Sequence, residues 1–181
     1  KLFIAQPPLF KLKKGNKDTY IQDEEGLDDF LLENSINELI TEESFKKNNI
    51  SKEDLIKSIS HFRRFKVYLD NLQRSGVDIR VLNLIIPILN KMTEFNHSSF
   101  EKEIIKSLKE LKKIEPLVDY NFKKDSKSSF VFSVKTQGRV KSSIISSAFI
   151  ESQLFVNALR EYSVSIDKIK FPLLFESKSG E

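Results

Sequence analysis

Residues 51–76 read SKEDLIKSISHFRRFKVYLDNLQRSG, and this segment shows strong helical periodicity. Its apolar residues recur at three- and four-residue steps, which places them on one face of an α-helix. They are Leu55, Ile59, Phe62, Phe65, Leu69 and Leu72. Ser51 stands where an N-terminal cap belongs and Gly76 where a C-terminal cap belongs. The segment therefore predicts one long amphipathic helix.

Two further helices are expected directly after this segment. Asp78 is a candidate N-cap for a helix that reaches about Met92 and contains Pro87, so this helix either kinks or divides into two. Ser98 and Glu101 fit a capping box for the next helix, which a proline at position 116 would end. Residues 51–115 thus predict three helices with short connections, packed as antiparallel neighbours.

The period changes from helical to two after residue 116, and antiparallel strands are expected over about residues 117–147. Residues 130, 132 and 134 alternate as apolar positions, as do residues 140 and 144 after the turn Thr136-Gln137-Gly138-Arg139. Ser152 is a candidate cap for a last helix, and the apolar run 169–175 resembles a strand interrupted by a proline. These patterns indicate the α+β class, with a helical middle between β-rich ends.

The N-terminal residues 3–15 read FIAQPPLFKLKKG. Two consecutive prolines exclude a helix and a central strand at positions 7 and 8. The alternation that follows places Phe10 and Leu12 on one face and Lys11 and Lys13 on the other, and the sequence Lys-Lys-Gly-Asn then predicts a hairpin turn.

After the hairpin, Asp23 is a candidate N-cap for a short helix that ends near Asn34. Residues 35–49 are more polar and are expected to be irregular, or a strand with a turn. This change in composition suggests a boundary between two parts of the chain.

Composition sets wider limits on the protein. Its 181 residues suit one domain or two small ones, and 39% hydrophobic residues with 15 phenylalanines are enough for a core. No apolar run approaches the roughly 18 residues of a membrane helix, and no secretory signal is recognised. The absence of cysteine excludes disulfides and thiolate metal sites. The chain starts without Met in a strand-like run, so it is expected to be a piece of a longer cytosolic protein.

The sequence contains no recognisable catalytic motif, neither a nucleophile elbow nor a phosphate-binding glycine-rich loop. Its acidic block at residues 23–29 suits a helix N-terminus better than a cation site, since consecutive helical carboxylates diverge. His61 and His97 have no second ligand at metal-binding spacing, and His61 is expected to be a helix-surface or half-buried histidine rather than a catalyst.

Lysines and arginines supply the candidate DNA contacts. The net charge of +4 does not by itself indicate a nucleic-acid-binding protein, but the basic residues cluster. The hairpin could neutralise phosphates, or its lysines could simply protect a strand edge from aggregation. The remaining candidates are weaker, because such charges are usually solvated. The full set is Lys11, Lys13, Lys14, Lys17, Arg63, Arg64, Lys123, Lys124, Arg139 and Lys141.

Residues 3–29 carry a resemblance to a known family. They combine an Ile-Ala-Gln-Pro-Pro-Leu-aromatic-Lys run, the Lys-Lys-Gly turn, a Tyr-Ile strand and an acidic helix start with Glu25 and Asp28. This pattern resembles the metal-binding (TOPRIM) region of the B subunits of bacterial DNA gyrase, which are type IIA topoisomerases. A looser resemblance returns at residues 148–155.

The resemblance implies a partial TOPRIM region at residues 1–33, an insertion domain at 34–147 like that of many Gram-negative enzymes, and a return into the TOPRIM region at 148–181. It implies double-stranded DNA and the gyrase A subunit as partners, in a heterotetramer without membrane contact. Mg²⁺ and ATP would serve the whole protein. The family's metal-binding carboxylate motifs are not found in this sequence, so no catalytic or metal residue and no cofactor is assigned to it.

Two other interpretations remain open from the sequence. The chain could be a stand-alone helical module that binds proteins or DNA, with solvated surface lysines. It could also be part of a topoisomerase IV B-type subunit with an unusual insertion.

Overall fold

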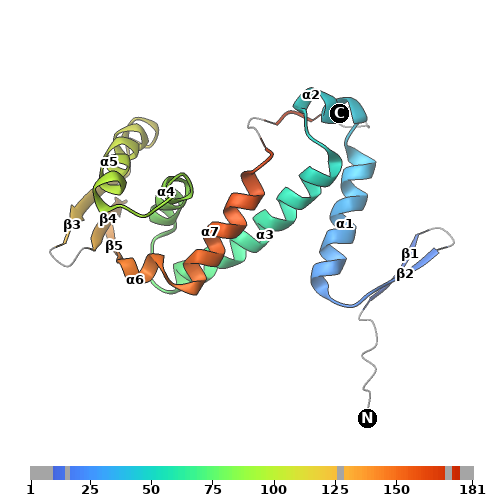
Figure 1. The fold of residues 1–181 in the computed structure, drawn as a ribbon, viewed down its shortest axis with the longest axis horizontal. Coiled ribbons are helices and arrows are strands. Elements are labelled where there is room, and N and C mark those ends of the chain that lie inside the picture. Colours follow the sequence, from blue (N-terminus) through green and yellow to red (C-terminus); the bar gives the residue numbers. More distant parts are fainter. Residues whose placement is uncertain (1–9, 15–16, 126–128, 170–172, 176–181) are drawn as a thin grey trace, which may run out of the picture. The chain divides into compact units, whose positions relative to one another are not determined.

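A computed structural model describes residues 10–14, 17–125, 129–169 and 173–175 of the chain (Figure 1). The chain divides into two compact units, residues 1–60 with 166–181 and residues 61–165. Helices and two small antiparallel sheets make up the described residues, so the predicted α+β class is confirmed. The expected apolar run and proline corner before Phe10 lie outside the described residues.

The first unit begins with a hairpin of β1 (Phe10–Lys14) and β2 (Lys17–Ile21). The register pairs Phe10 with Ile21 and Lys13 with Asp18. Phe10 and Leu12 are half-buried while Lys11 and Lys13 are exposed, so the alternation inferred from the sequence is confirmed.

Helix α1 (Glu24–Leu39) follows the hairpin, and its N-terminus has the expected cap. The Asp23 carboxylate accepts a hydrogen bond of 2.8 Å from the Gly26 amide. Glycine at this position has a steric reason, because a Cβ on Gly26 would lie 3.0 Å from the Cγ2 of Ile21 and 3.1 Å from the capping oxygen. A side chain there would disturb both the cap and the contact between α1 and the hairpin.

The prediction of irregular structure at residues 35–49 was wrong. Helix α1 continues to Leu39, and a second helix, α2 (Glu42–Asn48), follows it. Burial of Leu32 and Ile36 one turn apart stabilises the extension, despite the poor helix propensity of the intervening Asn and Ser. Thr41 caps α2, and Asn49 ends it with a positive φ of 49°.

The first unit has a small core. Within the described residues its buried apolar cluster contains Leu32, Ile36, Ile50 and Leu55, the last from α3 (Lys52–Arg74). The described part of the 169–175 run forms no strand, which corrects the strand-like interpretation. It is held instead by Asn48, whose amide nitrogen donates to the Leu174 carbonyl at 2.7 Å and whose oxygen accepts from the Leu174 amide at 3.1 Å.

The second unit contains the remainder of α3, four more helices and three strands. Its helices are α4 (Ile79–Asn90), α5 (His97–Ile114), α6 (Ser147–Ile150) and α7 (Gln153–Ile166). Its strands β3 (Asp119–Lys124), β4 (Phe130–Thr136) and β5 (Arg139–Ile145) form an antiparallel sheet in that order. The helices and the antiparallel strands expected after Ser51 are therefore present. Gln137 and Gly138 form the two-residue turn between β4 and β5 with positive φ angles, as expected of a primed hairpin turn.

One face of this sheet is buried against α4 and α5. Phe130, Phe132 and Val134 point to that face, and the rings of Phe100 and Phe130 lie 5.0 Å apart. In β5 the side chains that face the core are not the ones that the apolar positions 140 and 144 suggest. Ser143 and Ile145 face the core, whereas Val140 and Ile144 are about 60% exposed on the outer face.

The ends of α4 and α5 show how caps and tertiary contacts combine. Asp78 caps α4 as expected, and its own amide donates to the Ser143 hydroxyl of β5 at 2.8 Å. Pro87 lies inside α4, which continues through it as one helix. The expected capping box at Ser98 was wrong, because α5 begins two residues earlier and Asn96 accepts from the amides of Ser98 and Ser99.

Candidate nucleic-acid interface

The hairpin presents two described lysines on one exposed face. Lys11 is already engaged, since its ammonium lies 2.9 Å from the Asp18 carboxylate and 5.6 Å from the centre of the Tyr20 ring. This ion pair is exposed and therefore weak, so a phosphate could compete for Lys11 at little cost. Lys13 lies on the same face and has no ion pair within the described residues. The described part of the hairpin can therefore contact a phosphate backbone with one engaged and one available cation.

The other two hairpin candidates lie at the turn. Lys14 and Lys17 are opposite each other in the strand register, as the last pair before the connection. The positions of their side chains lie outside what the structure describes. Their backbone placement alone shows that all four candidate lysines of the first unit belong to one short two-stranded element.

Arg63 and Arg64 lie on α3 within the second unit. Arg63 is exposed and Arg64 is half-buried, and both take part in interactions within the molecule. Consecutive helical positions diverge by about 100°, so the two side chains leave α3 in different directions.

The four candidate DNA contacts of the β3–β4–β5 sheet lie on both of its faces and at both ends of its strands. Lys123 pairs with Val131 in the register and so lies on the outer face, whereas Lys141 pairs with Val134 on the core side. Lys124 lies 4.0 Å from Glu101, and Lys141 lies 3.9 Å from the Asp78 carboxylate. Arg139 is exposed at the turn, at the opposite end of the sheet from Lys124. The structure brings together the hairpin lysines more closely than those of the sheet.

A polar pair in the second unit was not predicted. The His61 Nδ1 on α3 lies 2.6 Å from the Glu161 Oε2 on α7, and Glu161 is only 6% exposed. Arg160 lies 3.7 Å from the other oxygen of Glu161. The two partners are a hundred residues apart, so local patterns cannot pair them. The available signal was that Glu161 falls on the same helix face as Phe155 and Ala158, which are fully buried.

The described residues contain no group of three or more His, Asp or Glu side chains that could hold a metal ion. The acidic residues at the start of α1 serve the helix N-terminus, where Asp23 caps and Glu24 and Glu25 lie in the first turn. Among the described helices, none has the length and apolar content to cross a membrane.

Comparison with known proteins gives a consistent result. No family model matches the chain. Eight curated proteins are similar to it, and each is named as the B subunit of DNA gyrase. The Rickettsia bellii protein is 28% identical over 160 residues, which are 86% of this chain and 19% of that protein. The Helicobacter pylori protein is 32% identical over 110 residues, which are 61% of this chain and 13% of that protein.

The match extends further in a third relative. The Campylobacter jejuni protein is 27% identical over 170 residues, which are 93% of this chain and 20% of that protein. The chain thus spans a fifth or less of the length of these relatives. The resemblance to the B subunits of DNA gyrase is therefore confirmed over most of the chain.

Proposed function

We propose that this chain is a segment of a DNA gyrase B-type subunit that contributes to DNA binding. On this proposal the whole protein is a cytoplasmic type II topoisomerase that supercoils DNA negatively by ATP-dependent double-strand passage, with the gyrase A subunit as its partner. The similarity to gyrase B subunits over up to 93% of the chain carries the proposal. All eight relatives bear that name, which favours gyrase over topoisomerase IV. Mg²⁺ and ATP belong to the proposal for the whole protein, and no residue of this chain is assigned to either.

The proposed organisation follows the resemblance. Residues 1–33 and 148–181 would belong to the TOPRIM region, and residues 34–147 to an insertion within it. The compact unit of residues 61–165, which has an apolar core of its own, shares residues 61–147 with this segment and also includes most of α7. An insertion with its own core can be present or absent without dismantling the domain that carries it.

Within this organisation, the β1–β2 hairpin is the best candidate for contact with the DNA backbone. Lys11 and Lys13 share its exposed face, and Lys14 and Lys17 flank its turn. Lysines in such an arrangement neutralise phosphates without reading sequence, and the binding they give falls steeply with salt.

Binding of a fluorescein-labelled 24-base-pair duplex to the 181-residue chain tests the hairpin. Fluorescence anisotropy would be measured between 50 and 200 mM salt. We expect Lys11→Ala/Lys13→Ala to weaken binding and to lower the slope of log K against log salt by about 1 per lost phosphate contact.

The matched control is Lys102→Ala/Lys109→Ala, which removes the same charge from two exposed lysines of α5. It should leave the slope unchanged. An equal loss in this control would reject the hairpin as the contact. No binding at 50 mM salt would favour the stand-alone interaction module.

The role of residues 34–147 is tested in the whole enzyme. A B subunit lacking residues 34–147, assembled with the A subunit, would be assayed for supercoiling and for DNA-stimulated ATP hydrolysis. We expect both to fall while basal ATP hydrolysis persists. Unchanged DNA affinity and unchanged DNA stimulation would show that the segment has no coupling role.

A further inference from the structure

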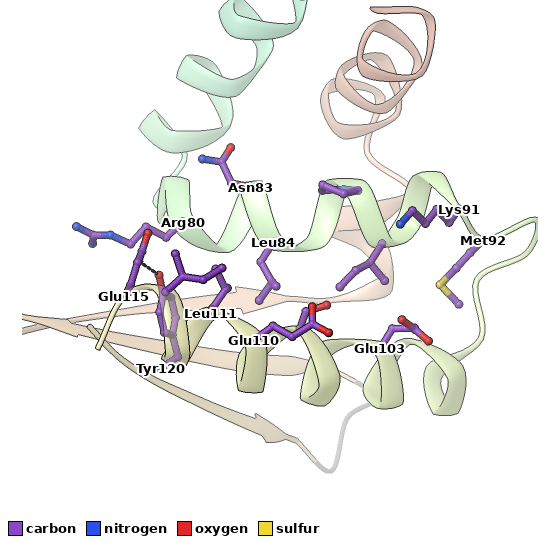
Figure 2. Close-up of a pocket in the computed structure, with 14 residues that line it drawn as sticks. Arg80, Asn83, Leu84, Lys91, Met92, Glu103, Glu110, Leu111, Glu115 and Tyr120 are labelled. Carbon is purple, nitrogen blue, oxygen red and sulfur yellow. Dashed lines mark hydrogen bonds between the residues drawn. The ribbon is translucent and has the colours of Figure 1, made fainter. Parts of the chain in front are cut away.

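A groove of about 610 Å³ runs between α4 and α5 in the second unit (Figure 2). Its lining residues extend from Arg80 of α4 to the C-cap residue Lys91, and from Glu103 of α5 to the C-cap residue Glu115. At 1.5 Å per helical residue each wall is about 17 Å long, which corresponds to three helical turns. Each wall is one line of residues spaced three and four apart. The α4 wall is Arg80, Asn83, Pro87 and Lys91, and the α5 wall is Glu103, Ser107, Glu110 and Ile114.

The two walls carry charges of opposite sign. The cations Arg80 and Lys91 are on the α4 wall, Lys91 as the C-cap residue, and the carboxylates Glu103 and Glu110 are on α5. Among the described residues, Lys91, Glu103 and Glu110 have no ion pair, and Arg80 reaches only Asp78, at 4.0 Å. The walls do not neutralise each other, so each can attract an occupant of the opposite charge.

The floor of the groove is apolar. Leu84 and Leu111 point into the space between the helices (Figure 2), and Ile114 at the α5 wall is 75% exposed. Pro87 has no N–H, so the Asn83 carbonyl lacks the donor that an α-helix normally supplies to it. The groove therefore offers apolar surface to inserted side chains and an acceptor on the α4 wall.

At one end of the groove, two polar side chains already form a hydrogen bond with each other. The Tyr120 hydroxyl donates to Glu115 at 2.7 Å, and burial together with this bond raises the pKa of Tyr120 to about 12. The phenol is therefore neutral near pH 7 and holds Glu115 in place. Glu103 and Glu110 remain as the carboxylates that can meet an occupant.

These features exclude several occupants. A phosphate or a nucleic acid would meet the carboxylates of α5, and a simple cation would meet the positive wall of α4. A helix three turns long presents a line of apolar side chains with a separate flank on each side, which matches two charged walls along an apolar floor. We propose that the groove binds an amphipathic α-helix of a partner protein, with acidic residues on the flank beside α4 and basic residues on the flank beside α5. This inference is independent of the DNA-binding role proposed above.

A designed peptide tests the proposal directly. The probe is a fluorescein-labelled 14-residue helix with Leu at three- and four-residue steps, Glu along one flank and Lys along the other. Its anisotropy would be measured against the 181-residue chain at 50 mM salt. We expect saturable binding that falls at least tenfold in Arg80→Glu/Lys91→Glu. Peptides with Glu on both flanks or Lys on both flanks should bind wild type at least threefold more weakly.

The variants provide a control and a rescue. Lys102→Glu/Lys109→Glu changes the net charge of the chain equally, on a face of α5 away from the groove, and should stay within twofold of wild type. The peptide with Lys on both flanks should bind Arg80→Glu/Lys91→Glu more tightly than it binds wild type, because both walls are then acidic. Circular dichroism would verify that both variants are folded.

Three results would overturn the proposal. The first is no saturable binding of the mixed-charge peptide to wild type. The second is an equal loss of binding in the control variant. The third is a dimer of the chain, in sedimentation velocity, that Arg80→Glu/Lys91→Glu dissociates, since a second copy would then be the occupant.

Discussion

The two compact units are stabilised in different ways. Within the described residues, the core cluster of the second unit has 19 buried apolar residues, from helices and all the strands but β3, whereas that of the first unit has four. The rings of Phe95, Phe100, Phe130 and Phe122 form a continuous series with centroids 5.0 to 5.5 Å apart in the second unit.

The first unit depends more on individual polar contacts between distant segments. Asp29 accepts from the Ser60 hydroxyl at 2.7 Å, Asp54 from the Lys168 ammonium at 2.9 Å, and Asn48 bonds twice to Leu174. Burial of apolar area stabilises by roughly 25 cal/mol per Å², whereas a net hydrogen bond contributes about 1 kcal/mol. The second unit should therefore be the more stable of the two, and the first should open locally at lower cost.

Truncation of a core residue in each unit is the strongest test of this difference. Phe130→Ala should destabilise the second unit by about 3–5 kcal/mol, because Phe130 is 1% exposed at the centre of the ring series. Ile36→Ala should cost about 2 kcal/mol, near the low end for such changes, because partly exposed neighbours can collapse onto the site. Amide hydrogen exchange would measure both changes segment by segment.

Phe130→Ala should lower protection across α4 and α5, while Ile36→Ala should lower it in α1 and spare α4. If Ile36→Ala lowered protection in α4 as much as in α1, the two units would unfold together and the comparison would fail.

The His61–Glu161 pair tests whether a polar contact matters inside the apolar unit. His61→Ala would leave a buried carboxylate with Arg160 alone, so we expect a loss of about 1–3 kcal/mol in urea unfolding. Glu161→Gln can still accept from His61 and should cost less. Equal losses in the two variants would show that the charge of Glu161, rather than the hydrogen bond, is what matters.

Asn48 tests the polar link in the first unit. Asn48→Ala removes both bonds to Leu174 and should cost about 1 kcal/mol. Asn48→Asp keeps an oxygen acceptor but places a carboxylate oxygen against the carbonyls of Leu174 and Ser44, so its effect should be at least as large. Exchange of the Leu174 amide reports this contact, and unchanged exchange in Asn48→Ala would mean that other contacts hold the segment.

The Asp54–Lys168 pair should give the smallest effect, because both side chains are at the surface. The hydrogen bond from Lys168, aided by one from Ser51, lowers the pKa of Asp54 below 3.8, and the same pair raises the pKa of Lys168 above 10.5. The Asp54 contribution is present above pH 3.8 and is lost as pH falls through the lowered pKa. The Lys168 contribution is present below pH 10.5 and is lost as pH rises through the raised pKa.

The contribution of this pair to the free energy of unfolding should therefore be constant between pH 3.8 and pH 10.5, and should fall outside this range. Side-chain NMR titration of Asp54 would show the lowered pKa, and Lys168→Met should return it toward 3.8. Screening by salt should weaken the effect further. An Asp54 titration that is identical in Lys168→Met and wild type would contradict the pairing.

Local chemistry was sufficient to predict several elements. Asp23 and Asp78 were identified as caps and Gly76 as a helix end, since these features depend on neighbouring residues alone. The same holds for the alternation of β1 and β4 and for the turn at Gln137-Gly138. In the candidate interface, the exposed face with Lys11 and Lys13 followed from alternation for the same reason.

Other features depended on contacts that local patterns do not contain. The extension of α1 rests on the burial of Leu32 and Ile36 against Ile50 and Leu55. In β5, packing against the helices decided that Ser143 and Ile145, rather than Val140 and Ile144, face the core.

The sequence by itself determined the α+β class, the helices after Ser51, the basic hairpin and the resemblance to gyrase B subunits. Short-range periodicity, caps and turns encode these features within a few residues. Only the tertiary structure paired His61 with Glu161, tied Asn48 to Leu174 and set Arg80 and Lys91 opposite Glu103 and Glu110 across a groove. Each of these contacts joins residues from different segments of the chain. The packing of whole helices and strands therefore has to be known before such a contact can be predicted.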